Sequence, residues 1–71
     1  MRWFALHVRV LERDTDLALL LLQEDGSTGV ETRAEGLVAW FRRREGAERA
    51  RAALRARFPR ARTRLGSAAD R

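Results

Sequence analysis

Hydrophobic and polar residues alternate over residues 3–10, WFALHVRV. A period of two is typical of a strand that buries one side and leaves the other accessible. The apolar side would carry Phe4, Leu6, Val8 and Val10, and the opposite side Trp3, Ala5, His7 and Arg9. The pattern therefore predicts that a half-buried strand comes first in the chain.

A leucine-rich segment follows the acidic sequence ERDTD and predicts a helix over residues 17–25. Because so many leucines surround it, this helix is expected to pack flat on a sheet. Asp14 or Asp16 would cap it, since either carboxylate can accept hydrogen bonds from the free amides of the first turn. Gly26 stands where the chain leaves the helix, and glycine adopts the left-handed conformation there at little cost.

The sequence GSTGVETRAEGLVAWF predicts a β-hairpin. After a turn at Ser-Thr, Gly29 opens a strand over residues 30–33, and residues 37–41 form the returning strand. The sequence RAEG, residues 33–36, makes the tight connection between them.

A second helix is expected to start near Glu45 and to stop at Pro59, which has no N–H for helix hydrogen bonding. Its inward stripe would consist of Ala47, Ala50, Leu54 and Phe58. Residues 60–65, RARTRL, alternate again and predict a last strand with three arginines on one side. Residues 66–71, GSAADR, are expected to be a linker or a disordered C-terminal end.

The predicted order of elements is strand, helix, strand, strand, helix, strand. Because crossover connections are right-handed, the common solution is a four-stranded antiparallel sheet with both helices on one face. We therefore expect an α+β fold, the ferredoxin-like β-α-β-β-α-β sandwich, over residues 1–65. In this topology the first strand lies between the third and the fourth, and the helices leave the other sheet face uncovered.

The alternation also predicts what the uncovered face carries. We expect it to hold Val38 and the partner-binding residues Trp3, His7, Arg9, Trp40, Arg60, Arg62 and Arg64. Two tryptophans beside a row of arginines would suit an anionic or flat partner. Alternatively, Trp3 packs against the chain terminus and Trp40 shields a thin core. A single bulge would also exchange Trp40 with Phe41.

The composition limits the class of protein. A chain of 71 residues makes one small domain, and such a domain buries about 60% of its unfolded surface. The absence of cysteine excludes disulfides and thiolate metal sites, and it fits a cytoplasmic location. The longest apolar run, residues 17–22, is too short to span a bilayer, and no signal peptide is visible, so no membrane partner is expected.

Charge is distributed unevenly along the chain. Residues 1–41 carry a net charge of −3, whereas residues 42–71 carry +8, and every basic residue is arginine. A basic half implies an anionic partner, which could be RNA, an acidic protein surface or a neighbouring domain. The alternative is the solvated side of an arginine-rich helix.

No catalytic, cofactor-binding or metal-binding residues are expected. His7 is the only histidine, so a histidine cluster for metal binding or acid–base chemistry is absent. Glu12, Asp14 and Asp16 are spaced like metal ligands but suit the start of a helix better. The GSTG sequence, residues 26–29, matches the loop with which KH domains clamp RNA, but it runs from a helix end into a strand and is interpreted as a turn.

The stretch DGSTGVETRAEGLVAWF with its flanks resembles the N-terminal domain of the PrmA-type methyltransferases. These enzymes modify lysines and the N-terminal amine of ribosomal protein L-eleven. In that family a leucine-rich helix ends in a G-x-x-G-hydrophobic-E turn, matched here by Gly26, Gly29, Val30 and Glu31. An aromatic residue near Met1, the hairpin and the alanine-rich second helix also match, so the resemblance covers nearly the whole chain.

The resemblance implies a substrate-recognition domain of ferredoxin-like fold that binds a large-subunit ribosomal protein. It would present this protein to a separate catalytic domain that holds S-adenosylmethionine. The family continues with a tryptophan-containing linker and a glycine-rich cofactor loop, whereas this sequence stops at Arg71. The chain alone is therefore expected neither to bind the cofactor nor to methylate. It would be an excised domain, a truncated gene product or an unrelated protein of the same fold.

Two other interpretations stay open. The chain could be an RNA-binding module that stacks bases on Trp3 and Trp40, although its third strand LVAWF lacks the basic-Gly-aromatic signature of RNA-recognition motifs. It could also form a homodimer through the open sheet face.

Overall fold

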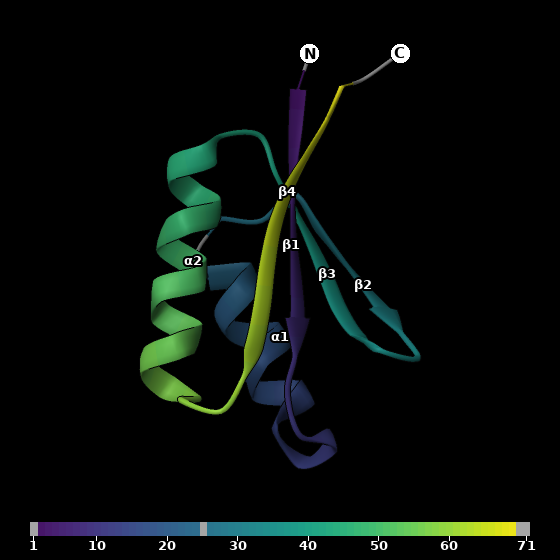
Figure 1. Cartoon of the computed structure of the whole chain (residues 1–71), viewed down its shortest axis with the longest axis vertical. Helices are drawn as coiled ribbons and strands as arrows, with labels where there is room; N and C mark the ends of the chain where they lie inside the picture. Colours follow the sequence, from purple (N-terminus) through teal and green to yellow (C-terminus); the bar gives the residue numbers. More distant parts are fainter. Residues whose placement is uncertain (1, 25, 70–71) are drawn as a thin grey trace.

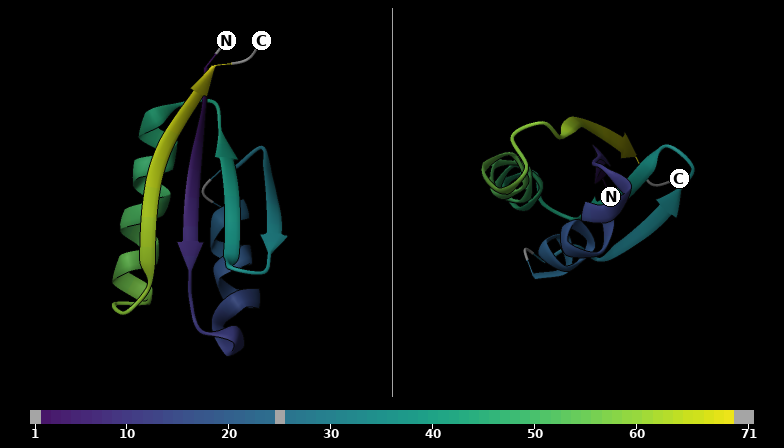
Figure 2. Two further views of the ribbon diagram at one scale, coloured as in Figure 1. Left: turned by 45° about the vertical axis from the view of Figure 1, so that its right-hand side comes forward. Right: turned by 90° about the horizontal axis from the view of Figure 1, so that it is seen from below.

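The computed structural model describes residues 2–24 and 26–69, and only the backbone of residues 2, 68 and 69. Its elements are β1 (Arg2–Arg9), the 3-10 turn η1 (Glu12–Asp14), α1 (Thr15–Glu24), β2 (Gly29–Arg33), β3 (Gly36–Phe41), α2 (Arg44–Arg57) and β4 (Arg62–Ala69). The strands form one antiparallel sheet in the order β2-β3-β1-β4. The left view of Figure 2 shows both helices behind this sheet. The predicted ferredoxin-like α+β fold is confirmed, with β1 between β3 and β4.

The hydrophobic core lies between the sheet and the two helices (Figure 1). Its largest fully buried side chains are Phe41, Leu6, Leu22, Leu37 and Leu54. α2 faces the core with the small residues Ala47 and Ala50, which are completely buried. Because the distance between packed elements depends on the side chains at the contact, these alanines let α2 approach the sheet closely.

α1 begins at Thr15, earlier than expected, and neither predicted aspartate caps it. Asp14 belongs to η1, and its backbone N–H donates to the Leu11 carbonyl at 2.8 Å. Asp16 lies inside the first turn of α1. The Thr15 hydroxyl donates to the same Leu11 carbonyl at 3.5 Å. A 3-10 turn therefore leads the chain into the helix, where we had expected a carboxylate cap.

α1 ends at Glu24, and Gly26 adopts the left-handed conformation predicted for it, while the predicted last helix residue, 25, lies outside the described residues. Gly26 has a φ of 86°, its N–H donates to the Gln23 carbonyl at 3.2 Å, and the Ser27 N–H donates to the Leu22 carbonyl at 3.3 Å. These bonds satisfy carbonyls that the helix leaves unpaired. Gly36, which closes the hairpin connection, also has a positive φ, of 139°.

β4 is longer than the alternation predicted. It runs from Arg62 to Ala69, and its residues 66–69 pair with residues 2–5 of β1. The expectation of a linker or disordered end is thus wrong for residues 66–69, while residues 70 and 71 lie outside the described residues. Gly66 and Ser67 carry no strand-like hydrophobic pattern, but backbone pairing with the central strand does not require one.

Candidate functional site

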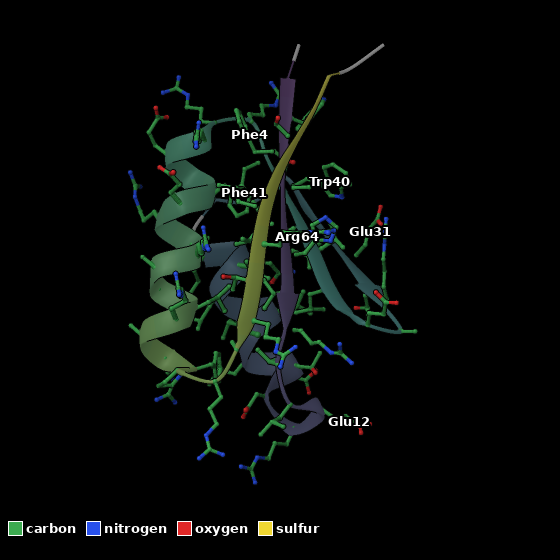
Figure 3. The ribbon with its side chains drawn as sticks, in the orientation of Figure 1. Phe4, Glu12, Glu31, Trp40, Phe41 and Arg64 are labelled. Carbon is green, nitrogen blue, oxygen red and sulfur yellow. The ribbon has the colours of Figure 1, made fainter. Side chains whose placement is uncertain are left out.

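The uncovered face of the sheet holds most of the residues predicted to bind a partner. Residues paired directly across antiparallel strands point to the same side. His7 of β1 pairs with Val38 of β3 on one side and with Arg64 of β4 on the other. Figure 3 shows Trp40 and Arg64 on the side away from the helices, with Phe41 on the helix side. Trp40 therefore faces outward as predicted, and no bulge exchanges it with Phe41.

Trp3 and Trp40 form what we call the aromatic end of this face. With Thr28 and Gly29 they line a shallow hollow of about 350 Å³. Gly29 pairs directly with Trp40, and because it has no side chain it leaves that side of the indole uncovered. Thr28 attaches the loop to β3, since its N–H and hydroxyl donate to the Trp40 carbonyl at 2.8 and 3.1 Å. The Arg42 guanidinium lies 5.3 Å from the centre of the Trp3 ring, within cation–π range.

The other end of the face is a hollow of about 720 Å³, which we call the arginine end. The charged and titratable side chains that line it are His7, Arg9, Arg33, Glu35, Arg62 and Arg64. Arg33 is held in place by Glu31, whose Oε2 accepts hydrogen bonds from Nε at 3.2 Å and Nη2 at 2.8 Å. The aromatic and arginine ends have no lining residue in common.

The arginine end changes the titration of His7. The pKa of His7 is lowered from its ordinary value, first by burial and then by the positive charges of Arg64 and Arg33. All three effects disfavour the imidazolium. An anion bound beside these arginines would oppose the electrostatic part of this shift, so the imidazole would report its binding.

Arg60 does not lie on the open face, contrary to prediction. β4 starts at Arg62, so Arg60 belongs to the turn after α2, which is closed by a 2.9 Å hydrogen bond from the Ala61 N–H to the Phe58 carbonyl. Arg60 instead lines a separate cleft that also contains Arg9 and Arg62. The regular spacing of arginines continued into the turn, and a period of two does not show where strand pairing begins.

Sequence analysis missed two features of the face. Arg33 was predicted where the first hairpin strand meets the connection, with no binding role, yet it lines the arginine end. Ala5 and Val38 lie on the uncovered side but are only 7% and 3% exposed. Both belong to the two central strands, and larger side chains stand around them on neighbouring positions.

The chemistry of the face is that of binding. Within residues 2–24 and 26–69, no three His, Asp or Glu side chains are grouped closely enough to hold a metal ion, so Glu12, Asp14 and Asp16 do not form such a set. The indoles offer apolar area, and the guanidinium groups can pair with carboxylates or phosphates. In the described part of the chain, none of the helices has the length and apolar character needed to cross a membrane.

No protein-family model matches the chain, and no curated protein matches its sequence.

Proposed function

We propose that this chain is the non-catalytic substrate-recognition domain of a cytoplasmic ribosomal protein methyltransferase. In this role the open face binds a large-subunit ribosomal protein. A separate domain with S-adenosylmethionine would then modify the bound protein. The resemblance to the PrmA-type enzymes and the geometry of the aromatic end together support this function.

One observation carries the proposal: the segment that bears the resemblance also builds the aromatic end. Gly26 ends α1 in a left-handed conformation, and Gly29 opens β2 directly opposite Trp40. The second glycine of the G-x-x-G turn therefore places no side chain directly opposite Trp40. Packing does not require a glycine at position 29, because an added Cβ would meet no atom within 4 Å.

The two tryptophans have the physical properties of interface anchors. Each ring presents a large rigid apolar surface at a small cost in conformational entropy. Trp40 pairs with Ala5 on one side and with Gly29 on the other, and Trp3 pairs with Ala68 of β4, so the sheet holds the backbone of both residues in place. Anchors of this kind commonly dominate the binding energy of a protein interface.

A titration of the isotope-labelled chain with ribosomal protein L-eleven, followed by amide NMR shifts, tests the proposal. We expect shifts around Trp3, His7 and Trp40. A hot-spot tryptophan contributes about 2 kcal/mol or more, so Trp40→Ala should weaken binding about thirtyfold. Leu20→Ala is the matched control, because this leucine of α1 is 49% exposed on the helical side.

The proposal fails if micromolar ribosomal protein causes no shifts, or if the shifts map to the helices instead of the sheet. Light scattering of the free chain at two concentrations is needed alongside. If the chain forms a concentration-dependent dimer that buries Trp3 and Trp40, the open face would be a homodimer interface instead.

The RNA-binding module remains the alternative, and the arginine end favours it. Stacking modules place aromatic side chains within a positively charged groove, whereas here the aromatic and arginine ends are separate hollows. The alternative predicts that log affinity falls with log salt concentration, with a slope of about −0.7 per contacted phosphate of a single strand. A flat salt response, or no binding at low salt, would reject it.

A further inference from the structure

A second cleft, of about 680 Å³, lies where β1 leaves the sheet and β4 enters it. One wall is the connection from β1 to α1, which includes Val10 and Leu11. The other wall is the turn from α2 to β4, which includes Phe58 and Pro59. We call it the end cleft. In the left view of Figure 2 these two connections lie at the same end of the sheet.

Short backbone hydrogen bonds hold both walls. On the first wall, the Asp14 N–H donates to the Leu11 carbonyl at 2.8 Å. On the second wall, the Phe58 N–H donates to the Leu54 carbonyl at 2.7 Å, and the Ala61 N–H donates to the Phe58 carbonyl at 2.9 Å. The cleft is therefore formed by ordered turns.

The interior of the end cleft is apolar. Val10 and Phe58 pack against the hydrophobic core and are partly buried, and Leu17 is partly buried as well. Leu11, in contrast, is 56% exposed. Leu11 and Leu20 are the large hydrophobic residues that stand exposed in the described part of the chain, and only Leu11 lies in a cleft. An exposed leucine in a concave site offers apolar area to a ligand.

The rim of the end cleft is strongly positive. Five arginines line it against the single acid Asp14, namely Arg9, Arg13, Arg57, Arg60 and Arg62. The ion pairs among the described residues are Arg33–Glu31 and Arg44–Glu48, and neither includes a rim arginine. Arg9 and Arg62 are moreover direct cross-strand partners. Like charges in that position repel each other, and a bound anion would relieve the repulsion.

The helix dipoles do not determine the sign of the charge in the cleft. α1 begins beside it and contributes partial positive charge, whereas α2 ends beside it and contributes partial negative charge. These contributions oppose each other. The arginine side chains therefore set the potential.

We propose that the end cleft binds an acidic peptide segment that carries an apolar side chain. The apolar side chain would pack against Leu11 and Phe58, and the flanking carboxylates would pair with Arg9, Arg60 and Arg62. Guanidinium groups bind carboxylates through paired, charge-assisted hydrogen bonds. A single strand of RNA fits the cleft less well. Phe58 is its only aromatic lining residue, and it is partly buried, whereas base stacking needs exposed aromatic rings.

This site is distinct from the aromatic end that supports the proposed function. The end cleft has no lining residue in common with the aromatic end, although it shares Arg9 and Arg62 with the arginine end. Failure of one proposal can be distinguished from failure of the other, because the amides around Trp3 and Trp40 report only on the aromatic end, and those of residues 10–17 and 57–61 report on the end cleft.

The test uses the whole chain and a short N-acetylated peptide of alternating Glu and Leu, titrated at low salt and followed by amide NMR shifts. We expect the shifts to lie in residues 9–17 and 57–62. Double charge reversal, Arg57→Glu with Arg60→Glu, should weaken binding about tenfold or more. The matched control is Arg49→Glu with Arg55→Glu, which changes net charge equally at exposed positions of α2 outside the cleft. It should weaken binding no more than about threefold.

A second pair of variants tests the apolar part of the site. Leu11→Gln should weaken binding about tenfold, because it removes apolar area that the bound side chain would otherwise cover. Leu20→Gln should leave it unchanged. Both leucines are exposed, so neither change threatens the fold.

Three results would overturn the proposal. The first is no shift at millimolar peptide, and the second is equal loss of affinity in the two charge-reversal variants. The third is that an oligouridylate of the same charge as the peptide shifts the same amides and binds as tightly as the peptide or more tightly. That result would assign the cleft to nucleic acid.

Discussion

The two faces of the sheet use the same strands in different ways. On the helix side, Leu6 and Val8 of β1 are 0% and 2% exposed. On the open side, His7 and Arg9 of the same strand point to a charged hollow. The covered face stabilises the fold by removing apolar area from water. The open face owes its geometry to that packing, and its side chains remain available to a partner.

The contrast between the faces is not simply one of exposure. Ala5 and Val38 are nearly as buried on the open side as the core residues are on the other. They are small or medium-sized side chains surrounded by larger ones. Ala5 therefore gives the open face a closed apolar position, whereas Val38 is one of the residues that line the arginine end.

The largest expected difference between the two faces is a difference in stability between variants of two successive residues of β3. Phe41 is 2% exposed in the core, whereas Trp40 points to the open side. Phe41→Ala should reduce the free energy of unfolding by about 3–5 kcal/mol, because it removes a large buried side chain and leaves a cavity. Trp40→Ala should cost much less. Urea denaturation of both variants measures the difference.

Equal losses of stability in the two variants would mean that the open side also contributes to the core. If Phe41→Ala is not folded in the absence of urea, Phe41→Leu provides a milder comparison with a smaller loss in the same direction.

A smaller effect is expected from the glycines of the open side. Gly36 has a φ of 139°, and an added Cβ would collide with the Val8 carbonyl oxygen of β1. Gly36→Ala should therefore destabilise the chain by about 1–3 kcal/mol through backbone strain. Gly66 of β4 has no atom within 4 Å of an added Cβ, so Gly66→Ala should change stability by less than about 1 kcal/mol.

Thermal denaturation of both glycine variants provides the measurement. A neutral Gly36→Ala variant would show that the start of β3 can move away from β1, and the close approach of the two strands would then be unnecessary for the fold.

The smallest effect concerns the pH dependence contributed by His7. Its pKa is lowered in the folded chain by burial and by Arg64 and Arg33. Below the ordinary histidine pKa of about 6.5, the unfolded chain therefore binds more protons than the folded one, and stability falls as the pH decreases. His7→Gln should remove this loss while matching the wild type above that pH.

Unfolding free energies of wild type and His7→Gln, measured at about neutral pH and at about pH 5, test the sign. If the unfolding free energy falls more between neutral and acid pH in the variant than in the wild type, the predicted sign is wrong. When both proteins also carry Arg64→Gln, the difference between their losses of stability at acid pH should become smaller. The substitution removes one of the positive charges that lower the pKa of His7.

Much of the fold could be predicted because its signals are local. The alternation over residues 3–10 and 37–41 correctly placed Phe41 toward the core and Trp40 away from it. Gly26 was correctly predicted at the end of α1, since few residues other than glycine tolerate a positive φ there. Signals that depend on the size or conformational freedom of single residues are readable without a structure.

The sites were less predictable because they depend on which segments meet. Arg60 was placed on the open face by its spacing from Arg62, yet it belongs to a turn. Leu11 and Arg13 carried no sequence signal of binding. They matter only because the β1–α1 connection faces the α2–β4 turn across the end cleft.

The sequence by itself determined the order of elements, the side to which most strand residues point and the glycine that ends α1. These features follow from local periodicity and backbone sterics. Only the tertiary structure decided that β4 continues to Ala69 along β1, and that Arg9 meets Arg62 at the edge of a cleft. The physical reason is that strand pairing and cleft formation are contacts between residues distant in the chain, and their register is set by the packing of the whole domain.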